Sequence, residues 1–294
     1  MVLKIKYGTR DNNIDVTKLA LEKCMNGNVL FIPRGDHDRA CLFSDPLEGV
    51  VKSIFVQKYN SLEEYDSLTE VFIQMNEQID LPPHSRLEII HSRLHISAGS
   101  FNDEVPEQLM VSKYIYGTEK VLEIGGNIGR NSLIIGYLLN EQRNTNFVCL
   151  ECDSDICNQL IYNRNINNLN FHVEASALSK RKLIQKGWDT ICSDVLLEGY
   201  KPVNTITLDE LNAKYNIHFD TLVLDCEGAF YYILQDMPEI LNNINLIIME
   251  NDYYNYNHKL YVDNVLRNRG FYVDHSEAGG WGPCQSHFFE VWKR

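Results

Sequence analysis

The segment VLEIGGNIGR (121–130) places an acidic side chain before a glycine-rich turn. Gly125, Gly126 and Gly129 remove side chains where the backbone must turn sharply and approach a ligand. Glu123 precedes them at the end of an apolar strand. A carboxylate there repels a pyrophosphate and attracts a ligand that carries ammonium and sulfonium charges. The alternative interpretation is a tight strand-to-helix turn that binds nothing.

A second acid, Glu151, ends the next apolar strand in FVCLECD (147–153). An acid at this position can accept hydrogen bonds from both hydroxyls of a ribose. Such acids are common to NAD sites and S-adenosylmethionine sites. Together with Glu123 and the glycine turn, Glu151 fits an adenosine that carries a cationic amino-acid tail instead of a diphosphate.

The third segment, LVLDCEGAF (222–230), brings two carboxylates and a glycine to another strand end. Asp225 ends the strand, Glu227 follows it, and Gly228 allows an abrupt turn into a helix. Ligands of α/β sheets bind at this carboxyl edge. The alternative is that Asp225 caps the following helix.

These segments need a sheet that brings their strand ends together. After Lys120, apolar strands alternate with helical stretches, which predicts an α/β fold with a doubly wound, mostly parallel, seven-stranded Rossmann-like sheet. The last two strands have only a loop between them, which predicts an antiparallel edge hairpin. The expected strands are 121–124, 147–151, 171–175, 221–225, 245–250, 271–275 and 287–292. The expected helices are 127–140, 154–167, 208–215, 229–241 with an interruption at Pro238, and 258–269.

Residues 1–80 differ in pattern and predict a small β-rich module, with Leu81-Pro82-Pro83-His84 as the boundary to a domain at 81–294. Residues 39–43 and 50–57 flank a Pro/Gly turn and predict a hairpin. Other expected elements are strands at 2–8 and 28–33 and a helix at 16–24. Three roles stay open for this module: binding a glycan, forming a homo-oligomer, or covering a sheet edge.

Composition excludes several classes of protein. The chain has 294 residues, and 27 basic minus 40 acidic residues give a net charge of −13. This charge argues against nucleic acid and against an anionic membrane as partners. No apolar run approaches the roughly 20 residues of a membrane span. The N-terminus has no apolar signal core, and the eight scattered cysteines suit reduced thiols. We therefore expect a soluble, cytoplasmic protein.

In this order, the motifs resemble those of the FkbM-type group of class I S-adenosylmethionine-dependent methyltransferases, over about residues 101–294. VLEIGGNIG is similar to the group's strand–acid–x–Gly–Ala–Asn–x–Gly motif, and FVCLECD to its second acidic strand end. LVLDCEGAF resembles its Lys-x-Asp-x-Glu-Gly-Ala-Glu motif. TITLDEL (205–211) and LIIMEND (246–252) resemble two further segments. Three residues depart from the pattern: Gly126 replaces Ala, Val223 replaces Lys, and Phe230 replaces the second Glu.

The resemblance implies methyl transfer from S-adenosylmethionine to a hydroxyl of a sugar, glycan or related small molecule. It implies that Glu123 faces the methionine ammonium, with Asn127 and the three glycines nearby. Glu151 holds the ribose, and Asp225 stands between the methionine end and the acceptor. The remaining expected cofactor contacts are Cys152, Ser176 and Ala177, the last two beside the adenine.

Methyl transfer to a hydroxyl requires either a general base that takes up the hydroxyl proton or a metal ion that weakens the O–H bond. Asp225 and Glu227 are the carboxylate candidates, and His287 is the preferred histidine because it follows a glycine-rich loop. A metal-assisted version places Mg²⁺ on Asp225, Glu250 and Asn251, at adjacent strand ends. The alternative is that Glu250 orients the acceptor or caps a loop.

Two other functions remain open at this stage. An NAD(P)-dependent oxidoreductase uses a similar sheet, but Glu123 and the DCEG segment speak against it. A non-catalytic scaffold is the other alternative, and the intact acids at 151, 225 and 227 argue against a decayed site.

Overall fold

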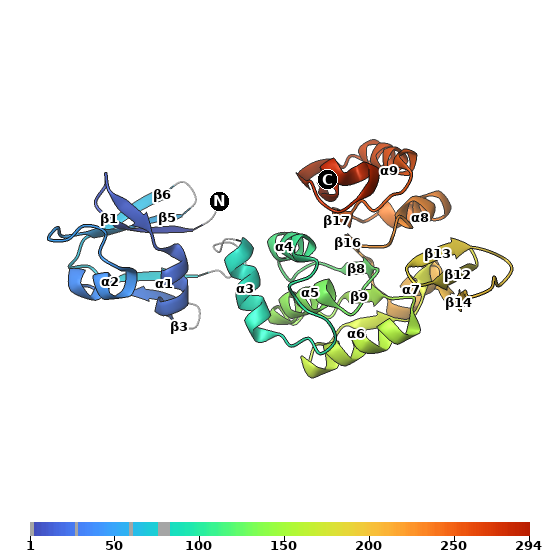
Figure 1. The fold of residues 1–294 in the computed structure, drawn as a ribbon, viewed down its shortest axis with the longest axis horizontal. Helices are drawn as coiled ribbons and strands as arrows, with labels where there is room; N and C mark the ends of the chain where they lie inside the picture. The colour runs from blue at the N-terminus through green and yellow to red at the C-terminus, as the bar shows by residue number, and fades with distance from the viewer. Residues whose placement is uncertain (1–2, 27–28, 59–60, 76–82) are drawn as a thin grey trace. The chain divides into compact units, whose positions relative to one another are not determined.

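The computed structural model describes residues 3–26, 29–58, 61–75 and 83–294. The chain divides into two compact units, Met1–Ile89 and Ile90–Arg294 (Figure 1). The domain boundary predicted at residues 80–81 lies outside the described residues. Among the residues that the structure describes, no helix is long and apolar enough to cross a membrane.

The C-terminal unit is built on a seven-stranded sheet with the strand order β10-β9-β8-β16-β17-β19-β18. The first five strands are parallel, and β19 runs antiparallel between β17 and β18. This confirms the predicted Rossmann-like sheet with an antiparallel edge hairpin. The strands are β8 (Val121–Ile124), β9 (Phe147–Leu150), β10 (His172–Glu174), β16 (Thr221–Leu224), β17 (Leu246–Glu250), β18 (Tyr272–Glu277) and β19 (Phe289–Lys293).

Helices cover both faces of this sheet, with α4, α5 and α6 on one side and α8 and α9 on the other (Figure 1). Strands β8, β9 and β16 are therefore buried on both faces, which explains their continuous apolar runs. The helices are α3 (Pro83–Arg93), α4 (Val105–Tyr114), α5 (Arg130–Glu141), α6 (Ser154–Ile166), α7 (Leu208–Tyr215), α8 (Phe230–Asp236) and α9 (Tyr256–Asn268). Two 3₁₀ turns cover Pro238–Leu241 and Gly282–His287.

Strand β8 is the point at which the strand order reverses. The chain passes from β8 to β9 and β10 on one side, and later to β16 and β17 on the other. In open α/β sheets, ligands bind in the crevice outside the carboxyl ends of the strands at such a point. The glycine turn after β8 and Asp225 after β16 lie there, because the two strands pair in parallel register.

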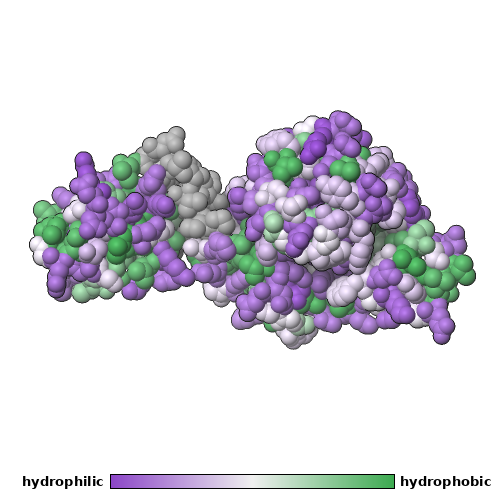
Figure 2. All heavy atoms as spheres, turned by 45° about the horizontal axis from the view of Figure 1, so that its top comes forward, coloured by the Kyte–Doolittle hydropathy of each residue, from purple (hydrophilic) through white to green (hydrophobic). Residues whose placement is uncertain are grey.

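The stretch 176–207, which the sequence leaves irregular, forms small sheets. Strand β11 (Ala177–Leu178) pairs with β15 (Thr205–Ile206). Strand β12 (Leu183–Lys186) lies between β13 (Asp189–Cys192) and β14 (Lys201–Val203). Figure 2 shows hydrophobic residues on the surface of this lobe. The exposed apolar side chains there are Trp188, Val195, Leu196 and Leu197.

The N-terminal unit contains two antiparallel sheets, ordered β2-β1-β5-β6 and β3-β4-β7, as the predicted β-rich module requires. Leucine, isoleucine and valine side chains from both sheets and from α1 form its core. The strands are β1 (Lys4–Gly8), β2 (Asn13–Asp15), β3 (Met25–Asn26), β4 (Val29–Ile32), β5 (Ser53–Lys58), β6 (Ser61–Tyr65) and β7 (Val71–Gln74). The helices are α1 (Thr17–Cys24) and α2 (Asp36–Phe43).

The hairpin predicted from residues 39–43 and 50–57 is wrong, because the first segment belongs to helix α2. Asp36 and Asp38 lie in the first turn of α2, where acidic side chains favour the helix dipole. Arg39 is fully buried and donates hydrogen bonds to backbone carbonyls that include those of Pro33 and Asp66. Strand β5 pairs with β1 and β6 instead.

The helix predicted from residue 127 begins three residues later. Asn127 and Gly129 have φ values of 46° and 102°, outside the right-handed helical region. The connection between β8 and α5 is therefore a longer turn than the sequence pattern indicates.

Candidate functional site

The glycine turn is packed against the neighbouring strand ends. Gly125 has a φ of +91°, and a Cβ there would lie 1.6 Å from the backbone oxygen of Asp225. The N–H groups of Gly125 and Gly126 both donate to the carbonyl of Leu150 at 3.0 Å. A Cβ on Gly129 would lie 2.6 Å from Leu160. The glycines thus allow protein segments to approach one another closely. The sequence alone does not distinguish this role from close approach to a ligand.

The surroundings of Gly126 leave no room for the alanine of the motif that this segment resembles. A Cβ at this position would lie 2.1 Å from Sγ of Cys149 and 3.1 Å from Cδ2 of Leu160. Its φ is one that any residue adopts, so only space prevents a side chain here. In this chain the Cys149 side chain occupies the space that an alanine methyl group would need.

Glu123 is 2% exposed and is directed onto helix α5. Its Oε2 accepts a hydrogen bond from the hydroxyl of Ser132 at 2.5 Å, and the Cys149 thiol is a second contact. Burial raises the pKa of the Glu123 carboxyl to about 7. The structure thus gives Glu123 a role in holding β8 to α5, and its contact with a methionine ammonium stays a prediction.

Glu151 is held in one orientation at the carboxyl end of β9. Its Oε2 accepts from the N–H of Asn127 and its Oε1 from the N–H of Asp153, each at 2.8 Å. Burial raises the pKa of this carboxyl. Each oxygen keeps a lone pair, because a carboxylate offers about four acceptor positions. Glu151 can therefore accept further hydrogen bonds from a ligand.

The remaining predicted cofactor contacts lie where β9 and β10 meet the lobe of β12–β14. Cys152 is half-buried, and Gln185 of β12 is hydrogen-bonded to it. Burial, aided by a neighbouring carboxylate, raises the pKa of the Cys152 thiol to about 11. The Ser176 hydroxyl donates to Oε1 of Glu174 at 3.3 Å, and Ala177 begins β11. Contact of Ser176 and Ala177 with an adenine stays a prediction.

Four carboxyl groups, here named the strand-end acids, gather after β16 and β17: Asp225, Glu227, Glu250 and Asp252. Burial is the largest cause of the raised pKa of each of the four. Burial, together with the neighbouring Asp225, raises the pKa of Glu250 to about 10, and burial raises that of Asp252 to about 7. Oδ1 of Asp252 accepts from the N–H of Gly228 at 2.7 Å. The predicted base candidates Asp225 and Glu227 are thus brought together with Glu250.

Helix α4 adds two acids that the sequence analysis missed. Glu107 is 6% exposed and hydrogen-bonded to Glu250, and burial raises its pKa. Glu104 pairs with Arg130 of α5, with its Oε1 2.8 Å from Nη1. Neither residue lies in a recognisable motif, and no spacing rule links α4 to the ends of β16 and β17. The available signal was the pair of acids around Pro106, which is typical of a helix start.

His287, the histidine predicted to be catalytic, lies two residues before β19 and next to Asn251, which follows β17. His287 ends the 3₁₀ turn at Gly282–His287 and does not open a strand as expected. Its Nδ1 is 2.8 Å from Oγ of Ser286, and its ring packs edge-on to Tyr256. Its backbone carbonyl accepts from Nδ2 of the fully buried Asn251. The catalytic role of His287 stays a prediction.

The magnesium site expected at Asp225, Glu250 and Asn251 gains no support. Asn251 has no exposed surface, and its amide group is turned to the carbonyl of His287. Within 3–26, 29–58, 61–75 and 83–294, no three His, Cys, Asp or Glu side chains are arranged to hold a metal ion.

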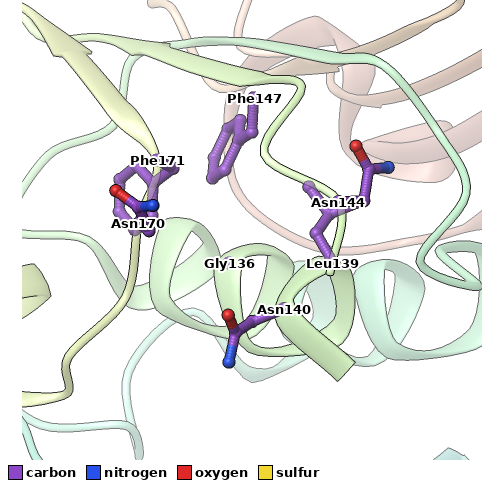
Figure 3. A pocket seen from close by; sticks show the side chains of 7 residues that line it. All are labelled: Gly136, Leu139, Asn140, Asn144, Phe147, Asn170 and Phe171. Carbon is purple, nitrogen blue, oxygen red and sulfur yellow. The ribbon is translucent and has the colours of Figure 1, made fainter. Parts of the chain in front are cut away.

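A small pocket lies at the other end of α5 (Figure 3). It is lined by side chains from the second half of α5 and from the segments entering β9 and β10, including Asn140, Phe147 and Phe171. These segments enter the sheet at the amino ends of its strands, whereas the acids described above lie at the carboxyl ends. The pocket is therefore separate from the candidate site.

Comparison with known proteins gives the following. No family model and no curated protein matches the chain. Among solved structures, a ribosomal protein L11 methylase from Lactobacillus delbrueckii subsp. bulgaricus is 12% identical, with 68% of this chain and 81% of that chain covered and a TM-score of 0.41. A precorrin-6y C5,15-methyltransferase from Geobacter metallireducens is 11% identical, covering 69% and 96%, with a TM-score of 0.42. A protein of the NADB-Rossmann superfamily from Streptococcus agalactiae is 14% identical, covering 68% and 69%, with a TM-score of 0.41. At these values the function rests on the geometry of the site.

Proposed function

We propose that Ile90–Arg294 is an S-adenosylmethionine-dependent O-methyltransferase of the FkbM type, acting on a hydroxyl of a sugar, glycan or related small molecule. The observation that carries this proposal is the fixed carboxylate of Glu151 beside the glycine turn. Asp225 lies at the neighbouring strand end on the other side of β8, where the strand order reverses. A ligand across this point contacts both acids.

The residues present fit the charges of S-adenosylmethionine. Glu151 has acceptor positions left for the two ribose hydroxyls. Gly129, at the N-cap position of helix α5, offers no side-chain cap, so the first N–H groups of that helix suit the methionine carboxylate. The carboxyl groups of Glu123 and Asp225 suit the ammonium and sulfonium charges.

Asp225 is the proposed general base. When bound, S-adenosylmethionine supplies a methyl group on a positively charged sulfur. The acceptor oxygen forms a bond to the methyl carbon as the carbon–sulfur bond breaks, and the sulfur keeps the electron pair of that bond. The hydroxyl proton passes to the carboxylate of Asp225, which is a stronger base than an exposed aspartate because burial raises its pKa. Alignment by the walls of the site supplies much of the rate enhancement, and Glu227 is the second candidate base.

The free state of all eight cysteines supports a reducing, cytoplasmic setting for this activity. The net charge of −13 supports an acceptor other than nucleic acid. For the N-terminal module we keep the three roles named above: binding a glycan, forming a homo-oligomer, or covering a sheet edge.

The test is calorimetric titration of the full chain with S-adenosylhomocysteine, with NADH as the comparison and with Mg²⁺ present or absent. We expect one-site binding of S-adenosylhomocysteine alone, independent of Mg²⁺. Preferential binding of NADH would favour the oxidoreductase. Binding of neither ligand would favour a scaffold that keeps only the fold.

A further inference from the structure

The strand-end acids lie on the acceptor side of the site. The glycine turn and Glu151 follow β8 and β9, whereas Glu250 ends β17 and Asp252 follows it, on the far side of β16. Helix α4 packs against β17 and brings Glu107 to Glu250. A cofactor bound over β8 and β9 leaves these carboxyl groups facing the second substrate.

Two of these buried carboxyl groups have an oxygen that nothing satisfies. Oε2 of Glu107 and Oδ2 of Asp252 are buried and have no hydrogen-bond partner among the described residues, and the two side chains are 6% and 4% exposed. A buried acceptor without a donor destabilises the protein by about 1–3 kcal/mol, and more when it is charged. Such groups persist where a ligand supplies the donor.

The titratable side chains around this place are mostly acidic. After burial, the largest influences on the pKa of Asp225 come from Asp252, Glu104, Glu107 and Glu227. Arg130 is the basic side chain that acts on Glu107, and its guanidinium is already engaged by Glu104 and Asp103. A phosphate or carboxylate on the acceptor would be repelled here, and a cation would be attracted.

An exposed aromatic pair begins two residues after Asp252 in the chain. Tyr254 and Trp281 pack with ring centroids 4.5 Å apart and are 83% and 39% exposed. Tyr254 follows Tyr253 in the chain, and Tyr253 lies next to Asp252, with Cδ1 only 3.4 Å from the place of a Cβ on Gly228. Exposed aromatic faces attract cations and also stack on sugar rings.

We propose that the acceptor carries a protonated amine, which is seated beside Glu107, Glu250 and Asp252. This inference rests on the proposed methyl transfer and names its substrate class, a hydroxyl compound bearing an amine such as an amino sugar. An ammonium group has three N–H donors, which match the unsatisfied carboxyl oxygens. A protonated amine has no lone pair, so the methyl group goes to a hydroxyl of the same molecule.

The test compares amines with their acetylated partners. The full chain, saturated with S-adenosylhomocysteine, is titrated in a calorimeter with glucosamine and N-acetylglucosamine, and with kanamycin and its fully N-acetylated form. We expect at least one amine to bind about tenfold more tightly than its acetylated partner. Equal affinities within both pairs, or no binding of either amine, would overturn the inference.

Single substitutions test whether the amine binds at this group of acids. Glu107→Gln keeps the shape and removes the charge, so it should weaken amine binding about tenfold and leave the acetylated partner unaffected. The control is Glu141→Gln, an exposed residue at the opposite end of α5. An unchanged amine affinity in Glu107→Gln would also overturn the inference. Failure of S-adenosylhomocysteine to bind the wild-type chain would instead refute the proposed methyl transfer.

Discussion

Gly126 and Cys149 should behave as one packing unit. An alanine at 126 would place its Cβ 2.1 Å from Sγ of Cys149, far inside the contact distance of about 3.5–4 Å. We expect Gly126→Ala to lower the free energy of unfolding by about 1–3 kcal/mol, the usual effect of overpacking a core. Cys149→Ala should lower it by about 1 kcal/mol, because it leaves a small cavity.

The double variant should be more stable than the sum of these effects predicts. Removing Sγ makes room for the alanine methyl group, so we expect a coupling free energy of about 1–2 kcal/mol. Urea unfolding followed by tryptophan fluorescence measures it. All three tryptophans of the chain, Trp188, Trp281 and Trp292, lie in the C-terminal unit, so the signal reports that unit.

The control is Gly126→Ala combined with Cys284→Ala. Cys284 is equally buried but lies in the 3₁₀ turn at Gly282–His287, so its effect should add to that of Gly126→Ala. Strict additivity in the Cys149 double variant as well would refute the steric explanation of Gly126.

Three further predictions concern the acids of the site. Glu151→Gln should weaken S-adenosylhomocysteine binding by roughly 1.5–3 kcal/mol in calorimetry, because the ribose loses a charged acceptor, whereas Glu141→Gln should not. Asp225→Asn should lower turnover more than cofactor affinity in a methyl-transfer assay, and an unchanged rate would exclude it as the base. Burial raises the pKa of Glu123 from 4.5 to about 7, so the folded chain keeps a proton that the unfolded chain releases. Stability should therefore fall as pH rises from about 4.5 to about 7, and a stability–pH curve of Glu123→Gln should lack about 3 kcal/mol of that fall.

The sheet could be predicted because its signals are local. Each strand of the parallel part is a short apolar run, and the helices between them show their own start and stop residues. Helix α7 begins at Leu208, as predicted, because Thr207 and Glu210 form a capping box there. The break of the helix after β16 at Pro238 was also predicted correctly.

The error in the N-terminal unit has a tertiary cause. Residues 39–43 combine Cys, Leu and Phe in a pattern that suits a strand, and no local signal outweighs it. The helix is stabilised by Arg39, whose guanidinium reaches carbonyls at Pro33 and Asp66, up to 27 positions away in the chain. Sequence patterns do not report such contacts, so the hairpin prediction failed there.

The acids of the candidate site also fall into two groups, those that a local pattern predicts and those that only tertiary packing brings to the site. Glu151 and Asp225 were found because a strand end is a local feature and parallel strands bring their ends to one edge. Glu107 was missed because it reaches that edge from α4, through packing of a helix on β17. Motifs thus locate the cofactor half of such a site, which the backbone of the sheet defines. The acceptor half is formed by side chains that only the tertiary structure assembles, and its chemistry has to be derived from their charges and unsatisfied atoms.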